Sequence, residues 1–470
     1  MTLSYRSLLV TVMAGVCGLA PLPAFASTAY VILGEQGRPV ARVLTEADHC
    51  PTVRADRRDL PMTVRREPGM VAQRPTASAV EFSKPSAFPV LTCELALPTG
   101  TRSATVDGHR LPLPRARLNR IVVIGDTGCR LKATDAAYQP CNDPAAYPFA
   151  RISARAAAWR PDAVIHVGDL LYRENPCPDS EAGCAGTPWG FGYDAWKADF
   201  FDPAAPLLAA APWIMTRGNH ESCARGGQGW WRFIDPRPPV ANQTCDRAAD
   251  DAAGDYSAPF AVPLGGGAQV VVMDHSGIGG KALATDDPRR ANIRQSFAEL
   301  DRLGRQARFT FALDHYPVLS ISADDKNGIM TLQPGNGAIQ SVIGAPDGGA
   351  LPDSVDVLLA GHVHLFEQAS FSSAHPSQFV TGFSGTLEDK VPLPETLPEG
   401  ASAGMGSVVE QFSSWVDGFG YMTLERRGVR SWAATIRDVD GHVVNRCRID
   451  GRRSSCRVKR VPSPATAPPR

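Results

Sequence analysis

Six short runs of mostly β-branched apolar residues constrain the fold of this chain more than any other feature of its sequence. They start near residues 121, 163, 212, 269, 309 and 355 and read IVVIG, AVIHVG, PWIMTRG, QVVVMD, FTFALD and VDVLLAG. Runs of this length without polar alternation are typical of strands buried on both faces. Most intervals between them are long enough for a helical crossover, and residues 150–159 are one helical candidate. A second helical candidate contains Ile293, Phe297, Leu300 and Leu303, whose spacing marks one face of an amphipathic helix. The pattern predicts a layered α/β core.

The segments on either side of this core read differently. Residues 27–118 are rich in Pro and Arg and hold short alternating stretches such as AYVIL and FPVLTCELAL, which fit either a small N-terminal β-rich domain or an extended wrap. We expect a β-rich domain at 27–118 and the main α/β domain at 119–445, where residues 419–444 alternate like two or three closing strands. A basic C-terminal tail, closed by a disulfide, is expected at 446–470.

The N-terminus predicts export. Arg6 precedes an apolar run from Leu8 to Ala20, and Ala24-Phe25-Ala26 supplies the small residues of a cleavage site. Residues 1–26 are therefore expected to be a signal peptide, and the mature chain to be periplasmic or secreted. No later segment has about 18 uninterrupted apolar residues, so we expect no membrane span after signal removal.

The cysteine count agrees with an oxidising compartment. Loss of Cys17 with the signal leaves ten of the 11 cysteines, an even number that favours disulfides. Spacing does not determine the connectivity, but pairing between sequence neighbours is the simplest arrangement. It would join Cys50 to Cys93, Cys129 to Cys141, Cys177 to Cys184, Cys223 to Cys245 and Cys447 to Cys456. A zinc cluster is disfavoured, because no Cys-x-x-Cys occurs.

The charge balance narrows the class of partner. Lys plus Arg and Asp plus Glu each number 48, which gives a formal net charge of zero. A surface that follows a nucleic-acid backbone is usually strongly basic. We therefore expect no nucleic-acid-binding surface and a small-molecule partner.

The polar residues that follow the strand runs are unusually uniform. Ligands of open α/β sheets bind beyond the carboxyl ends of the strands, and Asp, Asn and His recur at five of these ends. These endings are Gly125-Asp126, Gly168-Asp169, Gly218-Asn219-His220-Glu221, Asp314-His315 and Gly361-His362-Val363-His364. Any single one is typical of a turn or a helix cap. Together they are oxygen and imidazole donors for hard to borderline metals, and they exceed what one ion can use, so two ions bridged by a carboxylate are expected.

The series GDTG, GDLLY, GNHE, LDHY and GHVH, in this order over residues 121–364, resembles the calcineurin-like metallophosphoesterases. Most members place a His two residues after the first Asp. Purple acid phosphatases have Gly there and a Tyr three residues after the second Asp, and this sequence has Gly128 and Tyr172. It is therefore most similar to the purple acid phosphatases within the superfamily. The resemblance implies a layered metallophosphoesterase β-sandwich flanked by helices.

The resemblance also implies the ligands of two metal ions. The first site would hold Fe(III), which an anionic phenolate favours, and its ligands would be Asp126, Asp169, Tyr172 and His364. The second would hold Zn(II), Mn(II) or Fe(II), with Asp169 as the bridge and Asn219, His315 and His362 as further ligands. His220 would face the substrate as a phosphate donor or as the acid toward the leaving group.

The function implied is that of a secreted phosphomonoesterase that hydrolyses small phosphate esters by direct attack of metal-bound hydroxide. A phosphodiesterase or nucleotidase on the same scaffold is one alternative, and a catalytically silent metal-binding protein is another. The chain departs from many purple acid phosphatases in one respect, because residues 316–328 contain no His to face the substrate. Asp324 or Asp325 could occupy that place.

Overall fold

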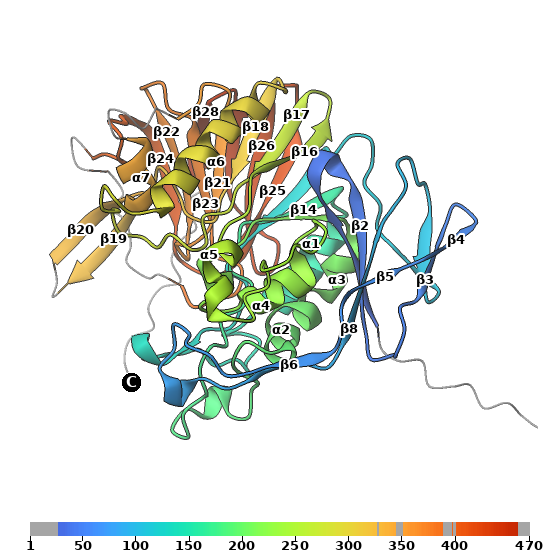
Figure 1. Ribbon diagram of the computed structural model, residues 1–470. Coiled ribbons are helices and arrows are strands. Elements are labelled where there is room, and N and C mark those ends of the chain that lie inside the picture. The colour runs from blue at the N-terminus through green and yellow to red at the C-terminus, as the bar shows by residue number, and fades with distance from the viewer. Residues whose placement is uncertain (1–26, 327–328, 345–350, 389–396, 398–400, 459–470) are drawn as a thin grey trace, which may run out of the picture.

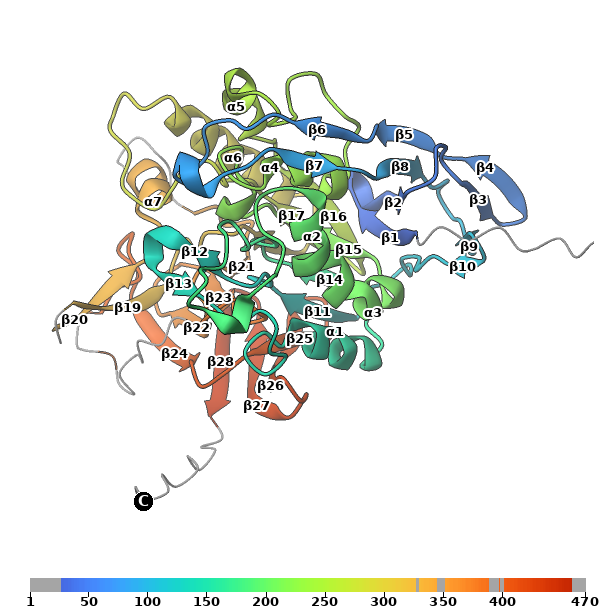
Figure 2. The same ribbon diagram turned by 90° about the horizontal axis from the view of Figure 1, so that it is seen from below.

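The computed structural model describes residues 27–326, 329–344, 351–388, 397 and 401–458. The expected signal peptide at 1–26 lies outside this range. Two stacked β-sheets form the centre of the molecule, and helices cover their outer faces (Figures 1 and 2).

The larger sheet has eleven strands. In spatial order they are β28 (Arg453–Val458), β27 (Val443–Asp450), β26 (Ser431–Asp438), β25 (Gly420–Arg426), β11 (Arg120–Ile124), β14 (Ala163–His166), β15 (Trp213–Met215), β1 (Thr28–Leu33), β2 (Pro39–Thr45), β8 (Leu91–Ala96) and β5 (Thr63–Arg66). The first three predicted runs become β11, β14 and β15, which pair in parallel. The closing strands predicted at 419–444 are β25, β26 and the start of β27.

The second sheet contains the other three predicted runs. Its seven strands, in spatial order, are β16 (Phe260–Gly265), β17 (Ala268–Val272), β18 (Phe309–Leu313), β21 (Val357–Ala360), β23 (Ser377–Thr381), β22 (Phe366–Phe371) and β24 (Val409–Trp415). Strands β17, β18 and β21 are again parallel neighbours. The six runs are therefore all strands, divided equally between two sheets.

Three hydrophobic layers hold the sandwich together. Between the sheets, Val123 and Ile165 of the first sheet pack in one cluster with Phe311 and Leu359 of the second. On the outer face of the first sheet lie α1 (Phe149–Ala158) and α3 (Asp202–Ala210). The outer face of the second is covered by α6 (Arg289–Gly304) and α7 (Gly337–Ile343). The predicted helix at 150–159 is α1, and the stripe from Ile293 to Leu303 is the buried face of α6. The layered α/β prediction is confirmed.

The N-terminal region is β-rich, as predicted, and it continues the larger sheet. Strand β1 pairs with β15, and β2, β8 and β5 follow it. A separate sheet with its own small core contains β10 (His109–Arg110), β9 (Ala104–Val106), β3 (Thr52–Ala55) and β4 (Arg58–Pro61). The domain boundaries at residues 118 and 445 remain predictions.

The remaining regular elements are short. Three two-stranded ribbons pair β6 (Gly69–Val71) with β7 (Ser86–Phe88), β12 (Leu131–Lys132) with β13 (Ala137–Tyr138), and β19 (Ile321–Lys326) with β20 (Ile329–Pro334). The short helices are α2 (Tyr193–Trp196), α4 (Gly227–Gly229) and α5 (Asp251–Gly254).

All five predicted disulfides are present, with the pairing between sequence neighbours. The last of them links β27 to β28 at the edge of the larger sheet. Within the described residues, no helix has the length and apolar character to cross a bilayer.

Candidate active site

The five polar strand ends meet at one edge of the sandwich. They follow β11, β14 and β15 of the first sheet and β18 and β21 of the second. Three of the residues there have left-handed backbone conformations, with φ of 53° at Asp126, 58° at Asp169 and 72° at His362. Such conformations are uncommon outside glycine and concentrate where a side chain must be aimed at a functional site.

The Tyr172 hydroxyl lies at the centre of one half of the cluster. Its oxygen is 2.8 Å from Oδ1 of Asp126, 2.8 Å from Oδ2 of Asp169 and 3.0 Å from Nε2 of His364. All four side chains are buried or nearly so. Burial, and then the two carboxylates, raise the pKa of the Tyr172 hydroxyl well above its ordinary value. The structure thus brings together the four residues expected at the first metal site.

The other half of the cluster surrounds Asn219. Its Oδ1 lies 3.0 Å from Nε2 of His315 and 2.9 Å from Nδ1 of His362. His315 Nε2 is also 3.1 Å from Oδ2 of Asp169, the oxygen that Tyr172 contacts. Donor atoms of Asp169, His315 and His362 lie within 4.8 Å of one another, close enough to hold one ion. Asp169 therefore connects the two halves, and all seven predicted ligands belong to one contact group.

The backbone contacts of two histidines would suit bound cations. Nδ1 of His315 donates to the carbonyl of Val167 at 2.9 Å, and Nδ1 of His364 donates to that of Leu387 at 2.8 Å. In a neutral imidazole this leaves Nε2 with a lone pair, and in both residues Nε2 faces oxygen atoms of the cluster. The single hydroxyl hydrogen of Tyr172 cannot serve two carboxylates and an imidazole. Cations would accept these lone pairs, and the hydrogen bonds to the carbonyls of Val167 and Leu387 would hold each histidine ring in place.

Gly128 provides the space that the tyrosine segment occupies. A Cβ atom at residue 128 would lie 2.7 Å from the backbone nitrogen of Tyr172, 2.7 Å from Oδ2 of Asp199 and 2.9 Å from the carbonyl oxygen of Leu170. A histidine at this position would therefore displace the segment that carries Tyr172.

Two buried carboxylates fix the loops that carry the cluster. Glu221, which follows His220, accepts backbone hydrogen bonds from Asp169, Leu170 and Gly218 among others. Asp199 accepts the backbone N–H of Tyr172 at 2.7 Å and pairs with Arg173 at 2.6 Å. Asp199 was not expected from the sequence, because it lies in a helical segment with no motif around it.

His220 lies beside the cluster and makes contacts of its own. Its Nδ1 is 2.7 Å from Oε1 of Glu174, and its Nε2 is 3.9 Å from Oδ2 of Asp169. Its ring lies on that of Tyr172, with 3.9 Å between centroids. Burial, and then the charge of Arg225, lower the pKa of His220. Glu174 and Arg225 were not among the residues expected from the sequence.

Two further histidines and two aromatic segments near the motifs belong to the interior. His166 contacts Thr127 at 3.0 Å, and His275 pairs with Asp314 at 2.5 Å. The aromatic segments at 189–196 and 229–233 contribute Trp196 and Phe233 to the hydrophobic core, so they pack against the fold. Asp324 and Asp325 fall outside the side chains that the structure describes.

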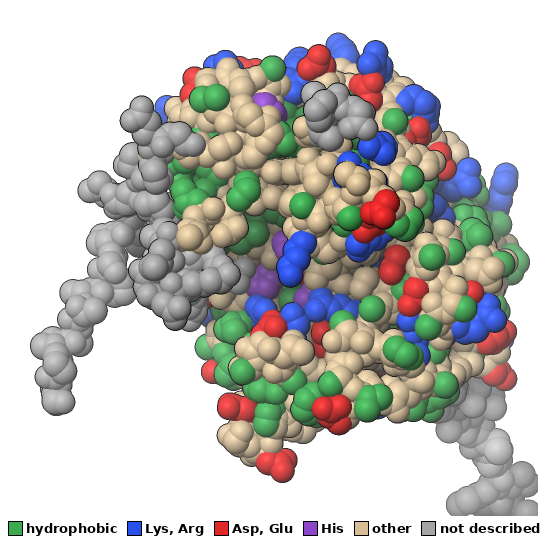
Figure 3. Space-filling view, turned by 60° about the vertical axis from the view of Figure 1, so that its left-hand side comes forward, with side chains coloured by type: hydrophobic (Ala, Val, Ile, Leu, Met, Phe, Trp, Pro, Cys, Tyr) green, Lys and Arg blue, Asp and Glu red, His purple; other side chains and the backbone are tan. Residues whose placement is uncertain are grey.

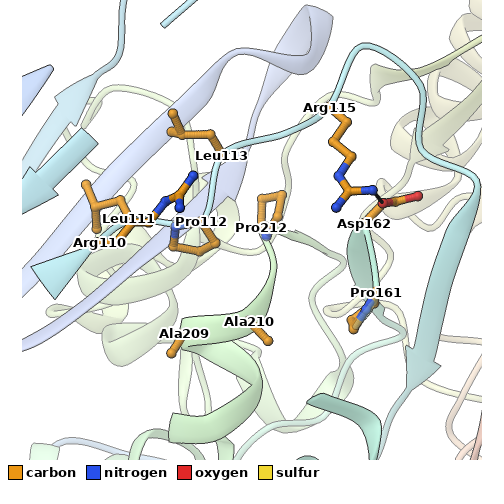
Figure 4. Close-up of a pocket in the computed structure, with 10 residues that line it drawn as sticks. All are labelled: Arg110, Leu111, Pro112, Leu113, Arg115, Pro161, Asp162, Ala209, Ala210 and Pro212. Atoms are coloured by element: carbon orange, nitrogen blue, oxygen red, sulfur yellow. Dashed lines mark ion pairs between the residues drawn. The ribbon is translucent and has the colours of Figure 1, made fainter. Parts of the chain in front are cut away.

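The cluster opens to one face of the molecule. Figure 3 shows histidine side chains inside a hollow, with Lys and Arg side chains beside them. A different cavity of about 300 Å³ is lined by residues such as Arg115, Asp162 and Pro212 (Figure 4). Asp162 and Pro212 immediately precede β14 and β15. That cavity therefore lies at the amino ends of the strands, away from the cluster.

Comparison with known proteins agrees with this geometry. The family model of the calcineurin-like phosphoesterases matches residues 119–366, which is more than half of the chain. A search of curated protein sequences finds no significant match.

One solved structure shares the fold, and two others are more distantly similar. The purple acid phosphatase PPD1 from yellow lupin (Lupinus luteus) seeds has a TM-score of 0.55 and 16% identity, over 92% of this chain and 74% of that one. PhoD has a TM-score of 0.49 and 11% identity over 95% of each chain. GAP50, the anchor in the inner membrane complex of Plasmodium, has a TM-score of 0.38 and 12% identity, over 71% of this chain and 89% of its own. The family match covers the five motifs and the strands that carry them, and the chain belongs to the calcineurin-like phosphoesterase family.

Proposed function

We propose that this protein is a phosphomonoesterase with two metal sites, of the purple acid phosphatase kind. Phosphoester hydrolysis and divalent metal ions follow from family membership. The observation that supports the finer assignment is the position of the Tyr172 hydroxyl, 2.8 Å from both Asp126 and Asp169. Most members of the family have a histidine ligand two residues after the first Asp. In this chain the phenol oxygen of Tyr172 would take the place of that histidine.

The ligands divide between two ions that share Asp169. Asp126, Asp169, Tyr172 and His364 would hold Fe(III), because a phenolate and two carboxylates are hard anionic donors. Asp169, Asn219, His315 and His362 would hold Zn(II), Mn(II) or Fe(II), which accept imidazole and amide oxygen. The contact of Asp169 Oδ2 with both Tyr172 and His315 supports its role as the bridge.

Bound cations of this kind activate a water molecule and offset the negative charge that develops on the phosphoryl oxygens. The protein's own side chains supply the rest. Backbone carbonyls at Val167 and Leu387 orient His315 and His364. His220 Nδ1 lies against Glu174, and Nε2 is the ring nitrogen nearer Asp169. In the imidazolium form, which both carboxylates favour, Nε2 would donate a proton to the leaving-group oxygen.

The proposed location is the periplasm or the exterior of the cell. Five disulfides support it, because disulfides persist in oxidising compartments. The signal peptide expected at residues 1–26 is part of the same proposal. Its direct test is N-terminal sequencing of the mature protein, which should begin at Ser27.

The ligand assignment is tested by colour. The iron-loaded protein should absorb visible light through phenolate-to-Fe(III) charge transfer, and Tyr172→Phe should abolish the band. Tyr30→Phe is the matched control, because Tyr30 is also fully buried but donates to the carbonyl of Phe233. A colourless wild-type protein with full iron occupancy would contradict the assignment.

The reaction is tested with paired substrates. An aryl phosphomonoester should be hydrolysed with a higher kcat/KM than the corresponding diester, and a strong preference for the diester would favour a phosphodiesterase instead. Asp169→Asn should remove turnover of both. Undiminished turnover in that variant would favour a silent metal-binding protein.

A further inference from the structure

Arg225 stands next to the proposed active site without belonging to any of the five motifs. It lies in the segment closed by the Cys223–Cys245 disulfide, four residues after Glu221. Its side chain is 13% exposed. Asp169, Tyr172 and Tyr316 are all close enough to interact with its charge. Its surroundings are therefore those of the proposed metal centre.

The guanidinium forms an ion pair at one end and is accessible at the other. Its Nε lies 3.3 Å from Oε1 of Glu174, a carboxylate that is 2% exposed and also contacts His220. Within the described part of the chain, neither Nη nitrogen donates a hydrogen bond to protein, and neither is buried away from solvent. Arg225 thus keeps two accessible donors in a fixed plane, the geometry that recognises the paired oxygens of a phosphate group.

The charge of Arg225 is permanent. Burial by itself lowers its pKa, but Glu174, Asp169 and the two tyrosines raise it, and the net result lies above the ordinary value. The negative charge of Glu174 offsets the positive charge of Arg225. Arg225 would therefore repel the proposed metal ions less strongly than an isolated guanidinium would. Residues 316–328 contain no histidine that could face the substrate, so a positively charged side chain from another segment could take that role.

We propose that Arg225 binds the phosphoryl oxygens of the substrate and favours phosphomonoesters over phosphodiesters. This proposal rests on the proposed function of the same site. A monoester dianion has three non-bridging oxygens and two negative charges, whereas a diester has two such oxygens and one charge. If the two metal ions bind two non-bridging oxygens, the diester has none left. The monoester still has a third, charged oxygen. The Nη nitrogens of Arg225 are placed to receive it.

The test compares two substrates in two variants of Arg225. Arg225→Gln should lower kcat/KM for an aryl phosphomonoester roughly tenfold to hundredfold, the scale of a lost hydrogen bond between charged groups. The same variant should change kcat/KM for the matching diester by less than about threefold. Arg225→Lys keeps a charge opposite Glu174 and loses the fork, so its monoester-to-diester ratio should lie between those of wild type and Arg225→Gln.

Binding of inorganic phosphate gives a readout independent of turnover. Calorimetric titration of the metal-loaded protein should show a dissociation constant roughly tenfold higher in Arg225→Gln than in wild type. The matched control is Arg232→Gln, which removes another arginine of the same disulfide loop, with a side chain 9% exposed and paired with Asp246. This control should leave both the phosphate affinity and the substrate ratio unchanged.

The outcomes separate this proposal from the proposed function. A wild-type protein without hydrolysis of either ester would reject the function itself. An active wild-type protein with equal losses on both esters in Arg225→Gln, or with an unchanged ratio in a folded Arg225→Lys, would overturn the role of Arg225 alone. Metal content equal to wild type in each variant shows that the effect arises at the substrate.

Discussion

Replacement of Gly128 by alanine probes the close packing that positions Tyr172. The added methyl carbon would lie 2.7 Å from the Tyr172 nitrogen and 2.7 Å from Asp199 Oδ2, whereas an ordinary carbon contact needs about 3.5 Å. One side must therefore move by roughly 0.8 Å. Asp199 cannot yield easily, because it accepts backbone hydrogen bonds from Cys129, Tyr172 and Arg173.

The magnitude follows from this fit. Overpacking of a rigid interior costs about 1–3 kcal/mol, and weakening one hydrogen bond to the Asp199 carboxylate adds about 1.5 kcal/mol. The reduced freedom of the unfolded chain offsets about 0.4–1 kcal/mol. The net expectation is a loss of about 1.5–4 kcal/mol. Because Tyr172 moves with its backbone, kcat/KM for a phosphomonoester should fall at least about tenfold.

Thermal unfolding by circular dichroism and initial-rate kinetics measure the two effects. Gly69→Ala is the control, because no atom lies within 4 Å of a Cβ atom built there. It should be neutral or slightly stabilising, with unchanged kinetics. A Gly128→Ala protein with the melting temperature and kcat/KM of the wild type would refute the claim that this glycine is required for space.

Three further perturbations test separate features. Burial raises the pKa of Glu367 to about 8 from its ordinary 4.5, only partly offset by the Ile321 N–H. The folded protein then holds a proton that the unfolded chain releases, so the free energy of unfolding should fall as pH rises from about 4.5 to 8. In urea titrations, Glu367→Gln should flatten this fall. A variant with the same pH profile as the wild type would contradict the assignment. Asp199→Asn leaves the buried Arg173 unpaired and should cost about 3–5 kcal/mol in urea unfolding. The exposed Asp202→Asn should cost less than about 1 kcal/mol, and equal losses would argue against the buried pair. Chelation of the metal ions should lower the melting temperature reversibly, because the site's oxygen and nitrogen donors then face one another without a cation; an unchanged melting temperature would count against a metal centre.

The sequence anticipated the parts of the site that follow strand ends. Asp126 and His362 come directly after Gly125 and Gly361, so their places follow once the strands are recognised. Tyr172 was identified only through the family resemblance, since a tyrosine after a strand has no distinctive chemistry by itself. Asp199 and Arg225 were not anticipated, because each reaches the site from a segment whose path depends on packing.

The sequence by itself determined which residues form strands and which donors follow them, since short apolar runs and the residues beyond them are local properties. The tertiary structure alone decided that the six runs divide between two sheets whose strand ends meet at one edge. It also decided that the space left by Gly128 is filled by the segment of Tyr172 and by Asp199. The physical reason is that these contacts join residues tens of positions apart. Their closeness is set by how the two sheets and the intervening loops pack, which no local pattern encodes.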